Sequence, residues 1–220
     1  MKTKILITLI ISFLCVSSSL AETIEERESR KHEFGISISD WIIETGMWNN
    51  SKHGNYIGVG NDKSRFVEDV NHSYTPHFGF SYLYRLNRWF SIGFLLDYQR
   101  TKWDRVTYNN LNEEVGSTKE YFYNLSILPT GRFTYYHHPW VNIYTSLSFG
   151  MVINGGSETD YYGNHTAYGY GFNINWIGVS VGRGPWYGAF EIGSMFGLKN
   201  VQTIYMANCR IFTLSIGYRL

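Results

Sequence analysis

The stretch that decides the fold is the last one: Asn208-Cys209-Arg210-Ile211-Phe212-Thr213-Leu214-Ser215-Ile216-Gly217-Tyr218-Arg219-Leu220. Its alternate positions are large and apolar, namely Phe212, Leu214, Ile216, Tyr218 and Leu220. The positions between them carry Thr, Ser, Gly and Arg. Strict alternation predicts a β-strand with two chemically opposite faces. Because the alternation continues to the final residue, we expect this strand to be paired within a sheet and not left as an open edge.

The same alternation recurs along the chain and predicts about eight strands. The stretches before the last one are 32–41, 73–86, 90–99, 119–135, 141–153, 168–181 and 186–192. After Trp176 the apolar parity changes without a turn, which predicts a β-bulge. Pro129 lies within a strand and lacks an N–H, so we expect a local break in the ladder there.

Short and long connections alternate between these strands. Short turns are expected near Asn87, His138 and Gly184, and longer connections after Trp41, Trp103, Ile153 and Gly197. Two of the longer ones, 43–71 and 104–118, are polar and are interpreted as loops. This rhythm predicts an up-and-down barrel with both chain ends on the side of the short turns.

The composition supports β structure. The chain has 18 Tyr, 14 Phe, 7 Trp and 22 Gly, with only 17% charged residues, a mixture that favours strands over helices.

One face of nearly every strand is bulky and apolar, and the other is small and polar. An eight-stranded barrel has room inside only for side chains. The small polar face therefore belongs inside, and the bulky apolar face requires lipid around the protein.

The terminal pattern from Phe212 to Leu220 resembles the C-terminal signal strand of bacterial outer-membrane barrels, although those usually end in Phe and this chain ends in Leu. The chain from about Phe34 onward resembles the outer-membrane β-barrel-domain family. The resemblance implies an all-β, closed antiparallel up-and-down transmembrane β-barrel of eight strands in a Gram-negative outer membrane. Short periplasmic turns and longer extracellular loops are expected. The implied partners are outer-membrane lipids and the barrel-assembly machinery, which would recognise Phe212, Leu214, Ile216, Tyr218 and Leu220.

The N-terminus predicts export. Residues 1–21 have a basic start at Lys2 and Lys4, an apolar core and a small-residue end, so they are expected to form a signal peptide cleaved near Ala21-Glu22. Residues 22–31 are expected to be a short periplasmic segment, and 32–220 the barrel. Cys15 could suggest lipidation, but Leu14 precedes it where a small residue is expected. After cleavage Cys209 is the remaining cysteine, so no internal disulfide is expected.

Other site chemistries have weak signals. The chain has 19 Lys and Arg against 18 Asp and Glu, and this balance does not indicate nucleic-acid binding. His137-His138 has no nearby Cys, Asp or Glu, so neither a metal site nor a cofactor is expected. A lipid-modifying enzyme would need a Ser–His arrangement, but no His is followed two residues later by Ser. His72 and Ser73 are adjacent and would point to opposite faces of a strand.

Charged residues on the inner face predict a luminal network. Parity places Glu33, Arg85, Arg132 and Glu191 inside, near the short-turn end, and places His77 opposite or one step from Asp97. Buried charges need partners, so Arg132 is expected to pair with Glu191 and the network to plug the lumen. The predicted role is structural or interactive, through surface loops with an unidentified ligand. A narrow passive pore is the alternative, followed by a lipid-modifying enzyme.

Overall fold

The computed structural model describes residues 29–40, 55–58, 65–109, 113–157, 166–198 and 210–220. The predicted signal peptide, its cleavage site and Cys209 lie outside the described residues, as do most of the segment 22–31 and the greater part of 43–64. Within the described part of the chain, no helix is long and apolar enough to cross a membrane.

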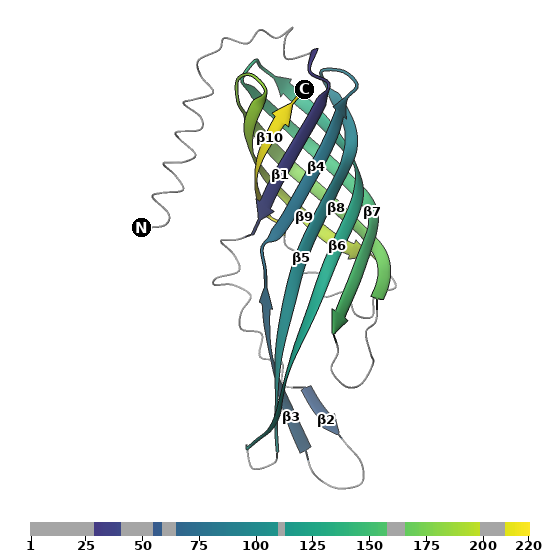
Figure 1. Cartoon of the computed structure of the whole chain (residues 1–220), viewed down its shortest axis with the longest axis vertical. Coiled ribbons are helices and arrows are strands. Elements are labelled where there is room, and N and C mark those ends of the chain that lie inside the picture. Colours follow the sequence, from purple (N-terminus) through teal and green to yellow (C-terminus); the bar gives the residue numbers. More distant parts are fainter. Residues whose placement is uncertain (1–28, 41–54, 59–64, 110–112, 158–165, 199–209) are drawn as a thin grey trace, which may run out of the picture.

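The described chain is almost entirely strand (Figure 1). The strands are β1 (His32–Ser39), β2 (Asn55–Gly58), β3 (Arg65–Tyr74), β4 (His77–Arg85), β5 (Phe90–Tyr108), β6 (Glu114–His137), β7 (Val141–Ser157), β8 (Thr166–Val181), β9 (Trp186–Leu198) and β10 (Phe212–Arg219). All pairings between them are antiparallel.

Eight of these strands form a closed barrel. The order β5-β4-β1-β10-β9-β8-β7-β6 returns to β5 through the β5–β6 pairing. The final strand closes it, because β10 pairs with β9 on one side and β1 on the other. The backbones of His32 and Leu220 exchange two hydrogen bonds of 2.9 and 2.8 Å. The predicted all-β, antiparallel, eight-stranded closed barrel is therefore confirmed.

Three tight turns lie at the end of the barrel where β1 begins and β10 ends, which we call the turn end. They occupy residues 86–89, 138–140 and 182–185, as predicted. In the first, the side-chain Oδ1 of Asn87 accepts hydrogen bonds from the backbone N–H groups of Trp89 and Phe90, each at 2.8 Å. In the third, Gly184 adopts a φ of 72°, which suits a residue without a Cβ.

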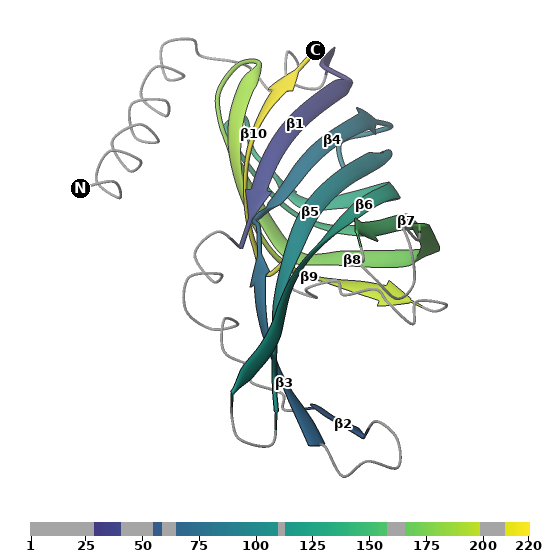
Figure 2. The same cartoon turned by 60° about the horizontal axis from the view of Figure 1, so that its bottom comes forward.

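At the opposite end, which we call the loop end, a sheet projects far beyond the barrel wall (Figures 1 and 2). The ends of β5 and β6 continue as a hairpin in which Tyr108 pairs with Glu114, and β3 and β2 add to its β5 side. The prediction that 104–118 is a loop is wrong, and 43–71 likewise contains β2 and much of β3. Both stretches lack apolar alternation because a sheet that leaves the barrel has no lipid face.

Two local irregularities match their sequence signals. The β8–β9 register shifts between Asn175 and Ile177, so the predicted bulge is confirmed, and Trp176 and Ile177 are both exposed. The β6–β7 ladder has no pairs at Leu128 and Pro129, between the Ile127–Met151 and Thr130–Ser148 pairs. The missing N–H of Pro129 explains this interruption.

The predicted inside and outside faces are confirmed. Large apolar side chains are exposed along the barrel wall, among them Ile36, Phe80, Phe149, Trp176 and Ile216. Buried positions include small and polar residues such as Ser39, Ser126, Ser148, Asn173 and Thr213. This is the reverse of a protein that folds around an apolar core in water.

Candidate functional site: the polar lumen

The lumen near the turn end holds a carboxylate shared by two arginines. Glu33 from β1 forms ion pairs with Arg132 from β6 and with Arg219 from β10, the latter at 3.3 Å from Nε to Oε2. Tyr187 donates its hydroxyl to Glu33 Oε1 at 2.9 Å. Arg85 adds a favourable electrostatic interaction with Glu33. We call these residues, together with Tyr144, the inner cluster.

Aromatic rings complete the packing of the inner cluster. The guanidinium carbon of Arg132 lies 4.2 Å from the ring centroid of Tyr144, and that of Arg219 lies 4.1 Å from the ring centroid of Tyr187. Such cation–π contacts are strongest when both groups are shielded from water. Arg219 is 1% exposed. The inner cluster therefore fills this part of the lumen with paired charge and rings.

Glu191 is near this cluster but is held by neutral groups. Tyr144 donates its hydroxyl to Glu191 Oε1 at 2.7 Å, and Asn175 donates its Nδ2 to Oε2 at 2.8 Å. The expected direct pairing of Arg132 with Glu191 is therefore wrong, because Glu33 takes that place. Tyr144 links the two acids by contacting both Arg132 and Glu191, and Glu191 also interacts electrostatically with Arg132 without a direct ion pair.

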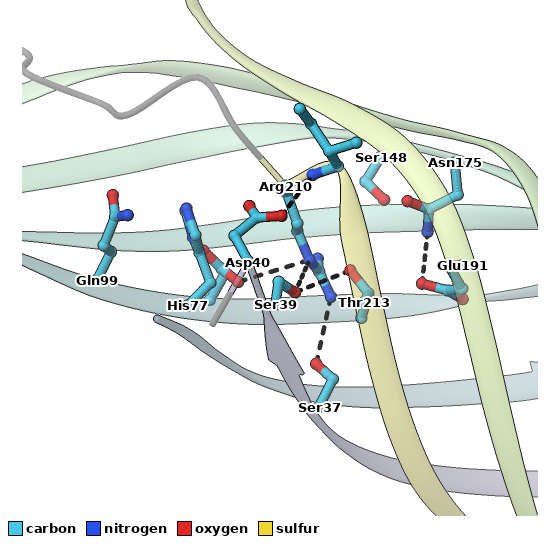
Figure 3. Close-up of polar contacts among 12 residues, drawn as sticks. Ser37, Ser39, Asp40, His77, Gln99, Ser148, Asn175, Glu191, Arg210 and Thr213 are labelled. Atoms are coloured by element: carbon cyan, nitrogen blue, oxygen red, sulfur yellow. Dashed lines mark hydrogen bonds and ion pairs between the residues drawn. The ribbon is translucent and has the colours of Figure 1, made fainter. Parts of the chain in front are cut away.

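A second group of buried polar residues, the outer cluster, lies where β1 ends and β10 begins (Figure 3). His77 from β4 contacts Asp97 from β5 at 2.6 Å between Nδ1 and Oδ2. Since a carboxylate only accepts, Nδ1 carries the proton and donates it. Arg210 donates Nε to Ser39 and Nη2 to Ser37, each at 3.2 Å. Its Nε lies 3.8 Å from Asp97 Oδ1.

The outer cluster also fastens the seam between the first and last strands. Ser39 on β1 and Thr213 on β10 share a hydrogen bond of 2.8 Å. Asp40, at a φ of 60°, accepts backbone N–H bonds from Ile211 and Phe212 at 2.9 and 3.0 Å. Arg210 lies just before β10, donates hydrogen bonds to Ser37 and Ser39 on β1, and lies near Asp97 on β5. The seam is thus closed by side chains as well as by its backbone ladder.

Beside these charged groups, the lumen contains a small apolar cluster made of Leu95, Leu128, Val152 and Met195. These residues are at most 5% exposed. Several buried polar atoms have no hydrogen-bond partner among the described residues, including His77 Nε2, Gln99 Oε1 and both side-chain polar atoms of Asn154 and Asn173. The described lumen therefore holds apolar as well as polar side chains, with most of its paired charge in two clusters.

The predicted network residues have the following places. Glu33, Arg85 and Arg132 lie in the inner cluster, His77 and Asp97 in the outer cluster, and Glu191 beside the inner cluster. Sequence reasoning did not assign Arg210 and Arg219 to this network. The alternation predicts an inward side chain for Arg219, because Arg219 shares the alternate positions of Gly217 and Thr213 on the last strand. The direction of Arg210 could not be predicted, because it precedes β10, where parity does not determine direction.

The described residues form neither of the other sites considered, a Ser–His catalytic pair on a strand or a metal site. His72 and Ser73 are consecutive positions of strand β3 and not of a loop. Within the described ranges no three residues among His, Cys, Asp and Glu form a group that could hold a metal ion. His138 packs its ring against Tyr136 and Trp140 in the turn.

Proteins similar to this chain are found among solved structures. No family model and no curated protein matches the chain. One similar structure is the N-terminal β-barrel domain of Pseudomonas aeruginosa OprF, with 13% identity, a TM-score of 0.42 and coverage of 72% of this chain and 98% of that one. Another is Ail of Yersinia pestis, solved with the heparin analogue sucrose octasulfate, with 14% identity, a TM-score of 0.39 and coverage of 86% and 99%.

Proposed function

We propose that this chain is an outer-membrane β-barrel whose filled barrel anchors a projecting sheet for interactions at the cell surface, without catalysis. The observation that carries the proposal is the reversed distribution of side chains, with bulky apolar groups outside and small polar groups inside. In water such an exterior would be an extended exposed apolar surface, which marks a membrane or protein contact. A closed barrel satisfies its own backbone hydrogen bonds, as the bilayer requires.

Aromatic side chains mark the two boundaries of the proposed membrane span. Trp89, Trp140 and Trp186 are 40%, 44% and 49% exposed near the tight turns. Tyr121 and Tyr168 are exposed toward the loop end. Amphipathic rings prefer the interface between hydrocarbon and water. Two such bands around an apolar wall support a transmembrane orientation with the turns in the periplasm.

The ion-paired clusters in the lumen support an anchoring role over a pore. A conducting path would have to pass both the inner cluster and the outer cluster, each of which contains an ion pair that bridges strands. Breaking such buried pairs is costly. We therefore expect no stable, sizeable conductance when the protein is inserted into a planar bilayer. Stepwise channels of defined size would favour the pore instead.

The projecting sheet supports the surface-interaction role. Its β6 portion before Tyr121 pairs with β5, whereas the β6–β7 pairing begins only at Tyr121. This leaves one edge of a strand open in the described sheet, and open edges accept an added strand from a partner. The described residues Glu113 to Ser117 are exposed, which suits a surface that other molecules can reach.

Site-specific labelling tests the orientation. In a Cys209→Ser background, Ser117→Cys on the projecting hairpin should react with a membrane-impermeant maleimide in intact cells. Arg183→Cys, in a tight turn, should react only after the outer membrane is permeabilised. If Arg183→Cys labels in intact cells and Ser117→Cys does not, the proposed orientation is wrong. If neither protein fractionates with outer membranes, the location is wrong.

A further inference from the structure

A band of tyrosines lies on the outward face of β5 and β6, where the barrel wall gives way to the projecting sheet. Tyr98, Tyr121 and Tyr123 are 41%, 38% and 41% exposed. From Phe90 to Tyr98 the outward face of β5 is apolar over about nine residues, the length with which a tilted strand crosses the hydrocarbon. The tyrosine band therefore coincides with the outer boundary of the proposed membrane span.

Cations lie directly at and beyond this band on the same face. Arg100 pairs across the ladder with Tyr123, and Lys102 pairs with Tyr121. The guanidinium carbon of Arg100 lies 4.4 Å from the ring centroid of Tyr121. Lys119, which is exposed, follows one step further and pairs across the ladder with Asp104.

The local charge on this part of β5 and β6 is positive. Asp104 is the carboxylate that β5 contributes here, and its Oδ2 lies 2.7 Å from Lys102 Nζ. Both side chains of that pair remain about one third exposed, at 34% and 35%. Between Arg100 and Asp104 of β5 and the facing stretch of β6 from Lys119 to Tyr123, this face carries three cations and one anion. On the neighbouring β3, the ladder places Asp69 opposite Val106, one step beyond Asp104. We call Arg100, Lys102 and Lys119 the basic patch.

We propose that the basic patch binds the phosphate of an anionic lipid headgroup in the membrane leaflet around the loop end of the barrel. The inference rests on the proposed membrane orientation and adds a ligand class to it. The phosphate of a lipid at this depth would accept hydrogen bonds from Arg100 and Lys102. The acyl chains of the same lipid would lie along the apolar outward face of β5.

The chemistry of the patch favours a phosphate over a neutral headgroup. Arginine offers planar N–H donors that match phosphate oxygens, and lysine adds a point charge. The ring of Tyr121 lies against the guanidinium of Arg100 and restricts it, so less side-chain freedom is lost on binding. Each cation near an anionic membrane surface contributes about 1 kcal/mol, or about fivefold in affinity.

The test uses the full-length protein reconstituted in phosphatidylcholine vesicles that contain a minor fraction of phosphatidic acid. After extraction in mild detergent, native mass spectrometry counts the lipids that remain bound. The wild-type protein should retain phosphatidic acid in preference to phosphatidylcholine. Arg100→Gln should lower that retention about fivefold, and adding Lys102→Gln should lower it further. Asp104→Asn should raise retention, because it removes the competing carboxylate.

Arg183→Gln is the matched control, because it removes an exposed cation from a tight turn at the opposite end of the barrel and should leave retention unchanged. Equal retention by Arg100→Gln and wild type would overturn the proposal, as would lower retention by Asp104→Asn. Displacement of phosphatidic acid by millimolar inorganic phosphate would show a site for free phosphate, not for a lipid. Alkaline extraction of the vesicles shows whether the protein has inserted into the bilayer. If it has not inserted, the membrane proposal itself fails.

Discussion

Replacing Glu33 by glutamine should weaken the barrel more than any other single change in the inner cluster. Glu33 is the shared acceptor of Arg132, Arg219 and the hydroxyl of Tyr187. Glu33→Gln preserves the shape of the side chain but leaves two guanidinium groups in the lumen without their carboxylate. Breaking a buried ion pair in this way costs about 3–5 kcal/mol.

The structure predicts an order among the variants. Arg132→Gln leaves Glu33 with Arg219 and Tyr187, so its cost should be smaller than that of Glu33→Gln. The double variant should cost less than the sum of the two single changes, because the residues contact each other. Arg132→Gln with Glu191→Gln should show weaker coupling, since these two residues form no direct ion pair and interact through Tyr144 and at longer range.

Equilibrium unfolding in urea, with the protein in lipid vesicles and tryptophan fluorescence as the signal, measures these differences. Folded and unfolded barrel can be counted in parallel by their different migration on gels without boiling. Glu114→Gln is the control, an exposed carboxylate on the projecting hairpin that should leave the midpoint unchanged. A loss below about 1 kcal/mol for Glu33→Gln would refute the reasoning, because that is the range of an exposed pair.

Three further expectations concern the wall and the seam. Phe80→Arg, on the outward face, should cost about 2–4 kcal/mol in lipid if it lies near the midplane, whereas the neighbouring Ser81→Ala should not; equal stability of the two would reverse the assigned faces. Gly93→Ala should destabilise by about 1–3 kcal/mol, because an added Cβ would come within van der Waals overlap of the backbone of Tyr82; an unchanged urea midpoint would contradict this. Deleting Tyr218–Leu220 removes the pairs of the last strand with Phe34 and His32 and should abolish recovery in the outer-membrane fraction; normal yield would show that these pairs are dispensable.

The alternation of apolar and polar residues along each strand was sufficient to predict the barrel from the sequence. A strand half in lipid and half in a narrow lumen must alternate, so the faces, the bulge at Trp176 and the break at Pro129 follow from residue order. The prediction of a loop over 104–118 is wrong for a related reason. The projecting hairpin extends beyond the barrel wall (Figure 1), so neither of its faces has to be apolar and its strands have no apolar period.

The luminal contacts depend on information that parity does not contain. Alternation places Glu33, Arg132 and Glu191 inside, but which of them meet depends on the stagger of the strands around the barrel. That stagger brings Arg132 from β6 to Glu33 on β1 and leaves Glu191 with Tyr144. Arg210 lies outside the regular strand, so no periodic pattern predicts its direction.

The seam between β1 and β10 has a consequence for folding kinetics. From β4 to β10 each strand pairs with its successor in the chain, so these hairpins can form from local segments. The seam instead joins Ser39 to Thr213, which are 174 positions apart. Bringing such distant segments together carries a large loop-closure entropy, and non-local pairing slows folding. Closure of this seam should therefore be the slow step, and until it occurs the edges of both strands stay open to other chains.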